Sequence, residues 1–361
     1  MNIGINSRIY QGKNTGIQNY IRSLYKNILE IDKMNHYVFF QTNDKKKLGI
    51  TRCLKLPNSL LGTFLFDNFL INILIGAENI SILHGPAHIL PFFKNKGVKY
   101  YVTIHDLSFL VLDDNRTKWF NLYYRHFMKR SLHNADVIIA DSENTKKDIK
   151  KFYNIPDDKI KTVYLGVNDY YFNAPKQKSL IHNKYFFSVS THPYRKNIPR
   201  VLDIFATNKK LQSYKFVIAG SMPKEHTDDL KKQIKKLGLE NRVILYGYAK
   251  TQELISLYQN AEFFIYPSYY EGFGLPVLEA MASKCPVIAS NTSSLPEIMP
   301  SKEWSFNPHD SQDINNIIDR MIGLSGEAKN VLIEKNYRFA KIFTWDKTAN
   351  AMLQIFKELD K

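Results

Sequence analysis

Two glutamates, Glu271 and Glu279, flank a short turn in the second half of the chain. The turn contains Gly272 and Gly274, which would let the backbone approach a ligand closely. Pro276 suits the first turn of a helix, so we expect the turn to lie at a helix N-terminus, where an anion such as a diphosphate is favoured. Carboxylates beside such a turn accept hydrogen bonds from hydroxyl groups. A nucleotide sugar would offer its sugar hydroxyls to Glu271 and its ribose hydroxyls to Glu279.

A second candidate is the pair Arg195 and Lys196, which follows an apolar run at 185–190. Arginine can bind a phosphate through two hydrogen bonds, and lysine supplies a movable point charge. Negative charge develops on the leaving group when a sugar–phosphate bond breaks, so fixed cations at this strand end would stabilise the transition state. The pair is therefore predicted to neutralise a diphosphate.

Two histidines come at the ends of apolar runs in the first half. His105 closes the run 100–105, and Asp106 after it could orient the imidazole ring or hold the turn. His84 closes the run 80–84, where it could line an acceptor site or belong to a structural turn. A lone histidine is more often structural, so these positions carry weight only with the rest of the pattern.

A glycine-containing loop at 11–20 precedes a helical pattern, and Gly16 stands where the helix would begin. The spacing is neither that of a dinucleotide-binding fingerprint nor that of a phosphate-binding loop with its lysine. The acidic residues Asp141 and Glu143 resemble a metal-binding triplet, but Ser142 between them is predicted to be a helix N-cap. No cysteine and histidine spacing typical of zinc is present, so we expect no metal.

Short apolar runs that alternate with helical patterns must position these residues, and they occur in two series. Runs buried on both faces and separated by helices indicate parallel sheets in right-handed βαβ units. The polar stretch 173–178 separates the series, so two Rossmann-like, doubly wound domains are predicted, with ligands beyond the carboxyl ends of their strands. The predicted strands are 37–41, 80–84, 100–105, 136–140, 160–165, 185–190, 216–219, 242–246, 263–266 and 286–290.

The stretches 268–281 and 286–297 together resemble the signature of retaining GT-B glycosyltransferases, the "glycosyl transferases group 1" family (family 4 type). The family often has a Cys-Gly pair after the signature helix, where this chain has Ser283 and Lys284. We therefore expect a left-handed conformation at Lys284, at a cost of about 1 kcal/mol. The pattern around His84, His105 and Arg195 is similar to that of bacterial O-antigen and capsule mannosyltransferases.

The resemblance implies two Rossmann-like domains that face a central cleft. Residues 1–172 would form the acceptor-side domain and 173–345 the nucleotide-sugar domain, and the C-terminal helix 346–361 would cross back to the first. It also implies catalytic and binding roles for particular residues. The implied catalytic residues are Glu271, His105, Arg195 and Lys196; the implied donor-binding residues are Gly16, Gly272, Phe273, Gly274, Leu275 and Glu279; and His84 and Asp106 would lie on the acceptor side.

The resemblance further implies a metal-independent hexosyltransferase without a cofactor, whose co-substrate is a nucleotide sugar, with GDP-mannose favoured. The acceptor would be a glycan linked to polyprenyl pyrophosphate, in the synthesis of O-antigen, lipopolysaccharide or capsule. Retention of the anomeric configuration is implied in the same way. A nucleotide-sugar epimerase of the same fold is the alternative.

The composition fits these expectations. Among 361 residues, 50 are Lys or Arg and 34 are Asp or Glu, a formal net charge of +16 that is spread over both halves. Such a charge suits a nucleic acid, an anionic lipid, a phosphorylated substrate or a lysine-rich solvated surface; without a recognition motif we expect no nucleic acid. Two cysteines form no disulfide framework, and the apolar run 60–75 is too short and polar to cross a bilayer. We expect a cytoplasmic protein, peripheral at the inner face of the cytoplasmic membrane.

Overall fold

The computed structural model of the protein describes residues 1–11, 16–42, 48–56, 59–112 and 118–358. The chain divides into two compact units. Unit 1 comprises Met1–Phe109, Asn115–Gly166 and Thr344–Lys361, and unit 2 comprises Leu110–Asp114 and Val167–Phe343. The main division after Gly166 lies slightly before the boundary predicted after residue 172.

Unit 1 is built on a seven-stranded sheet in the order β3-β2-β1-β4-β5-β6-β7, with parallel pairing throughout the described residues. Its strands are β1 (Asn2–Asn6), β2 (His36–Gln41), β3 (Ile50–Cys53), β4 (Ile82–Gly85), β5 (Lys99–Ile104), β6 (Val137–Ala140) and β7 (Ile160–Thr162). The central strands are buried on both faces, which explains their near-continuous apolar sequences.

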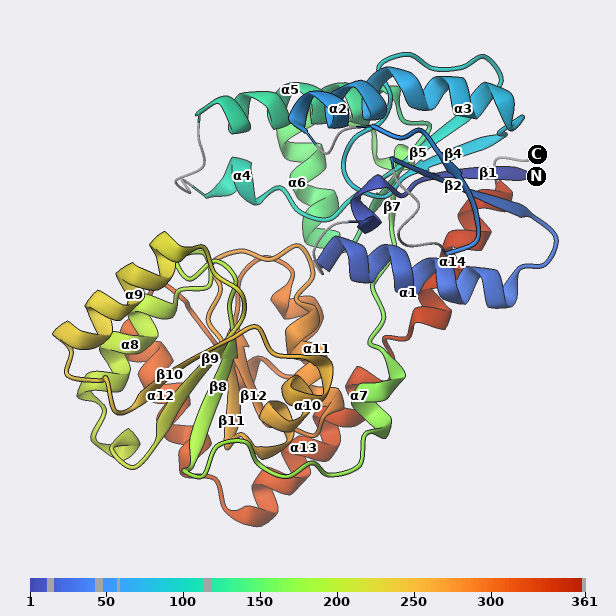
Figure 1. The fold of residues 1–361 in the computed structure, drawn as a ribbon. Helices are drawn as coiled ribbons and strands as arrows, with labels where there is room; N and C mark the ends of the chain where they lie inside the picture. Colours follow the sequence, from blue (N-terminus) through green and yellow to red (C-terminus); the bar gives the residue numbers. More distant parts are fainter. Residues whose placement is uncertain (12–15, 43–47, 57–58, 113–117, 359–361) are drawn as a thin grey trace. The chain divides into compact units, whose positions relative to one another are not determined.

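Helices cover both faces of this sheet (Figure 1). In Figure 1, α2, α3 and α5 lie together on one face, and α1 and α14, which pack against each other, lie on the opposite face. The helices are α1 (Gly16–Ile31), α2 (Leu60–Leu65), α3 (Ile71–Ala77), α4 (Ser108–Val111), α5 (Lys118–Asn134), α6 (Glu143–Tyr153) and α14 (Trp345–Glu358). A π-helical turn, η2 (Phe66–Leu70), joins α2 to α3.

Unit 2 has a six-stranded parallel sheet in the order β10-β9-β8-β11-β12-β13 within the described chain. Its strands are β8 (Tyr185–Val189), β9 (Lys215–Ala219), β10 (Val243–Gly247), β11 (Phe263–Tyr266), β12 (Val287–Ser290) and β13 (Ser305–Phe306). Its helices are α7 (Asp169–Asn173), α8 (Ile198–Thr207), α9 (Lys224–Lys236), α10 (Thr251–Asn260), α11 (Leu275–Ala282), α12 (Ser311–Ile322) and α13 (Gly326–Ala340).

The predicted fold class, two doubly wound parallel α/β sheets, is confirmed. In each sheet the strand order reverses once, between β1 and β4 in unit 1 and between β8 and β11 in unit 2. Ligands of open α/β sheets bind beyond the carboxyl ends of the strands at such a switch point. Two local predictions are also confirmed: Ser142 caps α6 by accepting a hydrogen bond from the Thr145 amide, and Lys284 has a φ of 58°.

Candidate functional site

The switch point of unit 2 holds a cluster of two cations and one carboxylate. Lys196 follows β8, and Glu271 follows the neighbouring strand β11. The Lys196 Nζ atom lies 2.5 Å from Glu271 Oε1, and Arg195 Nη1 lies 3.5 Å from Glu271 Oε2. Lys196 and Glu271 are both buried, with 6% of each residue exposed. Burial alone would raise the pKa of Glu271, but the charges of Lys196 and Arg195 outweigh it and hold that pKa below its usual value. Glu271 is therefore a carboxylate.

Tyr266, the last residue of β11, completes this cluster. Its hydroxyl group contacts Lys196 Nζ, which also lies 4.3 Å from the centre of the tyrosine ring. Tyr266 is 1% exposed, and burial raises the pKa of its phenol well above the usual value, so the hydroxyl stays protonated. The lysine side chain is thus fixed by a carboxylate and an aromatic face together.

The loop that carries Glu271 is held by the segment after β12. The Glu271 amide donates a hydrogen bond to Ser293 Oγ over 2.9 Å. The Ser294 hydroxyl donates to the carbonyl oxygens of Glu271 and Phe273, each at 3.0 Å. Gly274 has a φ of 104°, and a Cβ atom there would lie 2.6 Å from Leu295. These contacts fix the loop without using the Glu271 carboxylate.

The sequence Gly272, Phe273, Gly274, Leu275 leads into α11, as predicted. Gly274 is the N-cap of the helix and Leu275 its first residue. Phe273 is 4% exposed and meets Phe343 edge to face, with ring centres 6.0 Å apart. The first amides of α11 and its dipole favour an anion beside Arg195 and Lys196 of the same unit.

Glu279 lies one turn inside α11 and is held by two tyrosines of unit 2. The Tyr258 hydroxyl donates to Glu279 Oε2 over 3.3 Å, and Tyr171 also hydrogen-bonds to this carboxyl group. Burial raises the pKa of Glu279 to about 7, although both hydrogen bonds act to lower it. The group therefore changes its charge near neutral pH, unlike Glu271.

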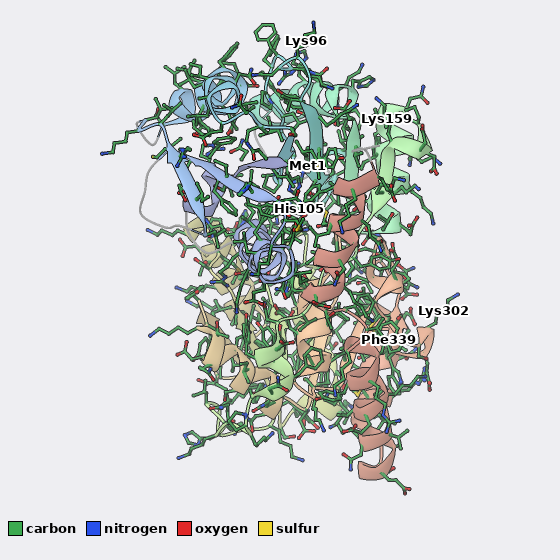
Figure 2. The ribbon with its side chains drawn as sticks, turned by 90° about the vertical axis from the view of Figure 1, so that its right-hand side faces the viewer. Met1, Lys96, His105, Lys159, Lys302 and Phe339 are labelled. Carbon is green, nitrogen blue, oxygen red and sulfur yellow. The ribbon has the colours of Figure 1, made fainter. Side chains whose placement is uncertain are left out.

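In unit 1, His105 follows β5 and is held between two acceptors. Its Nδ1 atom lies 2.7 Å from Asp141 Oδ2, and its Nε2 atom lies 2.8 Å from the Pro86 carbonyl oxygen. The ring of Tyr20 packs edge-on against the imidazole at 4.8 Å; Figure 2 labels His105 within unit 1. Burial opposes the charged imidazolium, but the Asp141 charge and both hydrogen bonds outweigh it and raise the pKa of His105.

Asp106, which could have oriented the histidine ring or held the turn, does the latter. Its Oδ1 atom accepts hydrogen bonds from the amide and hydroxyl groups of Ser108, at 3.0 and 2.8 Å, at the start of α4. The residue that orients His105 is Asp141, at the end of the neighbouring strand β6. The sequence could have indicated this pairing, because Asp141 and His105 follow neighbouring parallel strands, which end at the same sheet edge.

His84, the other candidate in unit 1, has no exposed surface. Its Nδ1 atom lies 2.5 Å from the Tyr25 hydroxyl and its Nε2 atom 2.7 Å from Thr103 Oγ1. Burial lowers the pKa of His84 to about 3, so the ring is neutral. In this structure the side chain ties α1 to the sheet, and any influence on an acceptor would pass through those contacts.

Gly16 is the first residue of α1, and a Cβ atom there would meet nothing within 4 Å. Residues 12–15 of the glycine-containing loop before it lie outside the described residues. In the part of the chain that is described, no group of three or more His, Cys, Asp or Glu side chains could hold a metal ion. Among the same residues, no helix is both long and apolar enough to span a bilayer.

Two doubly wound α/β units, the second with charged side chains at its switch point, define a protein of the GT-B class. The profile of the "Glycosyl transferases group 1" family matches residues 172–339, and that of "Glycosyltransferase Family 4" matches residues 16–170. The chain belongs to this glycosyltransferase family and is a hexosyltransferase, as predicted; enzymes of the family are metal-independent.

Relatives and solved structures agree with this assignment. The chain is 29% identical over 290 residues to O-antigen chain mannosyltransferase B of Escherichia coli. The aligned region covers 77% of this chain and 74% of that protein. Sucrose-phosphate synthase from Thermosynechococcus elongatus superimposes with a TM-score of 0.79, at 18% identity over 99% of both chains. Anabaena HepE in complex with UDP and glucose superimposes with a TM-score of 0.78, at 16% identity over 99% of this chain and 100% of that one.

Proposed function

We propose that this hexosyltransferase moves mannose from GDP-mannose to a glycan acceptor linked to polyprenyl pyrophosphate, at the inner face of the cytoplasmic membrane. The product would be a surface polysaccharide such as O-antigen or capsule. The similarity to an O-antigen chain mannosyltransferase supports the choice of sugar and pathway. The family assignment supports a nucleotide sugar as the donor.

The observation that carries the donor half of the proposal is the buried cluster of Arg195, Lys196 and Glu271. Two cations and a helix N-terminus at one switch point supply the positive field that a diphosphate needs. The single Glu271 carboxylate now offsets part of the charge of these two cations. Donor phosphates would take over part of that role and leave Glu271 to accept hydrogen bonds from the sugar hydroxyls. Glu279, deeper in α11, would accept hydrogen bonds from the ribose hydroxyls.

In the proposed reaction the bond between the sugar C1 atom and the phosphate oxygen breaks, and the nucleoside diphosphate leaves with the electron pair. An acceptor hydroxyl attacks C1 from the same face, and its proton passes to the departing phosphate, so the anomeric configuration is retained. Lys196 and Arg195 stabilise the charge that grows on the leaving group.

His105 would contact the donor sugar in this scheme. With Asp141 and the Pro86 carbonyl oxygen as acceptors, both ring nitrogens would carry hydrogen, and the raised pKa of His105 favours the imidazolium form. A cation held in this way adds to the positive field around the donor. Its orientation is fixed by Asp141 before any ligand binds, so little ordering cost remains.

The first experiment is calorimetric binding across a panel of nucleotides and nucleotide sugars. A ligand at about 100 times its Kd stabilises the fold by about 2.7 kcal/mol, so thermal shift gives a second readout. GDP and GDP-mannose should stand out. A uridine preference would refute the mannose donor while keeping the family. Absence of binding by every nucleotide would refute the donor site itself.

Transfer is then tested in the Glu271→Ala variant, which should lose activity while keeping its far-UV circular dichroism. Glu240→Ala, an exposed position of the same unit outside the cluster, serves as the matched control. Near-normal turnover by Glu271→Ala would contradict the donor-loop assignment. EDTA should leave wild-type activity unchanged, and inhibition that Mg²⁺ reverses would contradict a metal-independent mechanism.

A further inference from the structure

One helical segment of unit 1 presents an apolar stripe outward. Residues 60–77 run through α2, the π turn η2 and α3. Every fourth residue from Leu61 to Ile73 is a large apolar side chain that the structure leaves exposed, and 67% of Leu61 and 63% of Ile73 are accessible. Leu65 and Phe69, between them, are also exposed. A solvated helix face normally carries charged or polar groups instead.

The π turn keeps this stripe on one side of the helix. An α-helix has 3.6 residues per turn, so each four-residue step overshoots a full turn and the stripe would drift around the axis. A π turn closes its hydrogen bonds from i to i+5 and holds more residues, so a four-residue step falls short there. Phe66–Leu70 therefore compensates for the drift on either side.

Two polar residues of the segment, Asp67 and Asn68, are buried, which is the reverse of an ordinary surface helix. The sequence 60–77 contains one charged residue, Asp67, and it is buried and paired with Arg8 over 2.7 Å. Asn68 is fully buried and accepts a hydrogen bond from Arg130 Nη2 over 3.0 Å. These interactions hold the helix in this rotation, so the stripe cannot turn inward without breaking a buried ion pair.

Two further aromatic side chains extend the stripe. Phe92 stacks on Phe69 with ring centres 5.9 Å apart, and Phe93, 60% exposed, lies 6.1 Å from the same ring. The Arg130 guanidinium lies 4.3 Å from the centre of the Phe92 ring and donates to the carbonyl oxygens of Leu90 and Pro91, which fixes this loop. The six residues Leu61, Leu65, Phe69, Ile73, Phe92 and Phe93 are called the apolar face below.

Exposed cations occur in the segment after Phe93 and on the helix that packs against α2. Lys96 and Lys99 follow Phe93 in the chain, and Arg125 and Lys129 are exposed on α5. The helix α5 lies beside α2 in Figure 1, and Phe127 of α5 meets Phe64 of α2 at 5.6 Å. Figure 2 labels Lys96 at the end of unit 1 where these helices lie. Apolar side chains between cations match the two layers of an anionic bilayer, its hydrocarbon edge and its headgroups.

We propose that the apolar face docks unit 1 onto an anionic phospholipid membrane, with the helical segment 60–77 lying in the plane of the interface. This inference deepens the proposed function, because it names the surface by which the enzyme reaches a membrane-linked acceptor. Vesicle binding requires neither donor nor sugar transfer, so the membrane contact and the transfer reaction can fail separately.

The test is co-sedimentation of the full chain with vesicles of phosphatidylcholine alone and with about a third of phosphatidylglycerol. The wild type should bind the anionic vesicles, and added salt should weaken the binding. The triple variant Leu61→Gln, Ile73→Gln and Phe93→Gln should lose about tenfold or more in the partition coefficient, because three side chains no longer gain from burial. The charge-reversal variant Lys96→Glu and Lys129→Glu should lose affinity for anionic vesicles only.

The matched control is the triple variant Met34→Gln, Val331→Gln and Ile342→Gln. It replaces three other apolar residues that are at least half exposed and lie outside the apolar face. The control should bind vesicles like the wild type. Nucleotide binding and the thermal midpoint should be the same in all variants, which shows that the chain is folded.

Three results would overturn the proposal. In the first, the wild type does not sediment with anionic vesicles. In the second, both triple variants lose binding equally. In the third case the wild type is a dimer in gel filtration, the apolar-face variant is a monomer, and neither binds vesicles. The apolar face would then be an interface between two copies of this chain.

Discussion

The pH dependence of nucleotide-sugar binding follows from Glu279. Its carboxyl group is buried, and its pKa is about 7 in the protein without ligand. In the proposed donor site the ionised carboxyl would accept hydrogen bonds from two ribose hydroxyls, whereas a protonated carboxyl has one oxygen that must donate. Donor binding therefore selects the ionised form and releases a proton, so the affinity should rise with pH.

The size of the expected change in Kd follows from the pKa of Glu279. With a pKa of about 7, about one carboxyl group in ten is ionised at pH 6 and about nine in ten at pH 8. If only the ionised form binds, the Kd of a nucleotide sugar should fall about tenfold between these values.

The same pKa affects stability without ligand. Because it lies above the ordinary 4.5, Glu279 contributes about 3 kcal/mol of stability below pH 4.5, which is lost as the pH rises through 7.

The assay is calorimetry with an intact nucleotide sugar between pH 6 and 8. A free nucleoside diphosphate is unsuitable, because a terminal phosphate monoester itself titrates near about pH 6. In Glu279→Gln the affinity should be low and should no longer rise with pH. In Tyr258→Phe the midpoint should move to higher pH, since the variant removes a hydrogen bond that lowers the pKa of Glu279. A flat profile in the wild type, or an unchanged one in Glu279→Gln, would refute the reasoning.

Three other changes test separate features. Lys196→Ala should lose roughly 2–4 kcal/mol of transition-state stabilisation, seen as a lower kcat at saturating donor. Asp141→Asn should lower the pKa of His105 in an NMR titration, because the carboxylate that raises this pKa is gone. Stability from His105 is present below its ordinary pKa of 6.5 and lost as the pH rises through the higher folded-state value. Gly166→Ala should destabilise the fold by about 3 kcal/mol or more in denaturant unfolding, because its Cβ would lie 2.1 Å from the Trp345 amide nitrogen.

Each of these three predictions has a result that would contradict it. A change in acceptor KM alone in Lys196→Ala would contradict a role at the leaving group. An unchanged histidine titration in Asp141→Asn would contradict the ion pair with His105. For Gly166→Ala the control is Gly326→Ala, where a Cβ atom meets nothing within 4 Å, and equal destabilisation of both would contradict the steric reason.

The central strands of both sheets could be predicted because they are buried on both faces and have short apolar sequences, whereas the exposed or half-buried edge strand β3 was not predicted. The lengths of the strands were harder to predict. The run 160–165 forms a strand only over Ile160–Thr162, because Thr162 pairs with Ala140, the last residue of β6. The two-residue strand β13 gives no apolar run that a pattern could detect. Strand length depends on the neighbouring strand, which local sequence does not encode.

Some residues of the candidate site could likewise be predicted from the sequence, and others could not. Loop and helix-start residues such as Glu271 and Lys196 follow strands that neighbour each other, so their proximity followed from the topology. Tyr266 was hidden, because a tyrosine at the end of a buried strand has the pattern of a core residue. Tyr258 belongs to α10, and only tertiary packing brings it to Glu279. His84 could not be assigned from a strand end alone, since one residue of register decides whether the side chain faces the core.

The placement of α14 has a consequence for synthesis on the ribosome. This last helix belongs to unit 1, packs against α1 and stacks Phe356 on Tyr101 with ring centres 5.5 Å apart. The earlier part of unit 1 is translated first but lacks these contacts until α14 has been made, whereas the residues of unit 2 all precede α14 in the chain. The second unit can therefore complete its folding before the first, and a nascent chain carries an open apolar surface around Tyr101 until α14 has emerged.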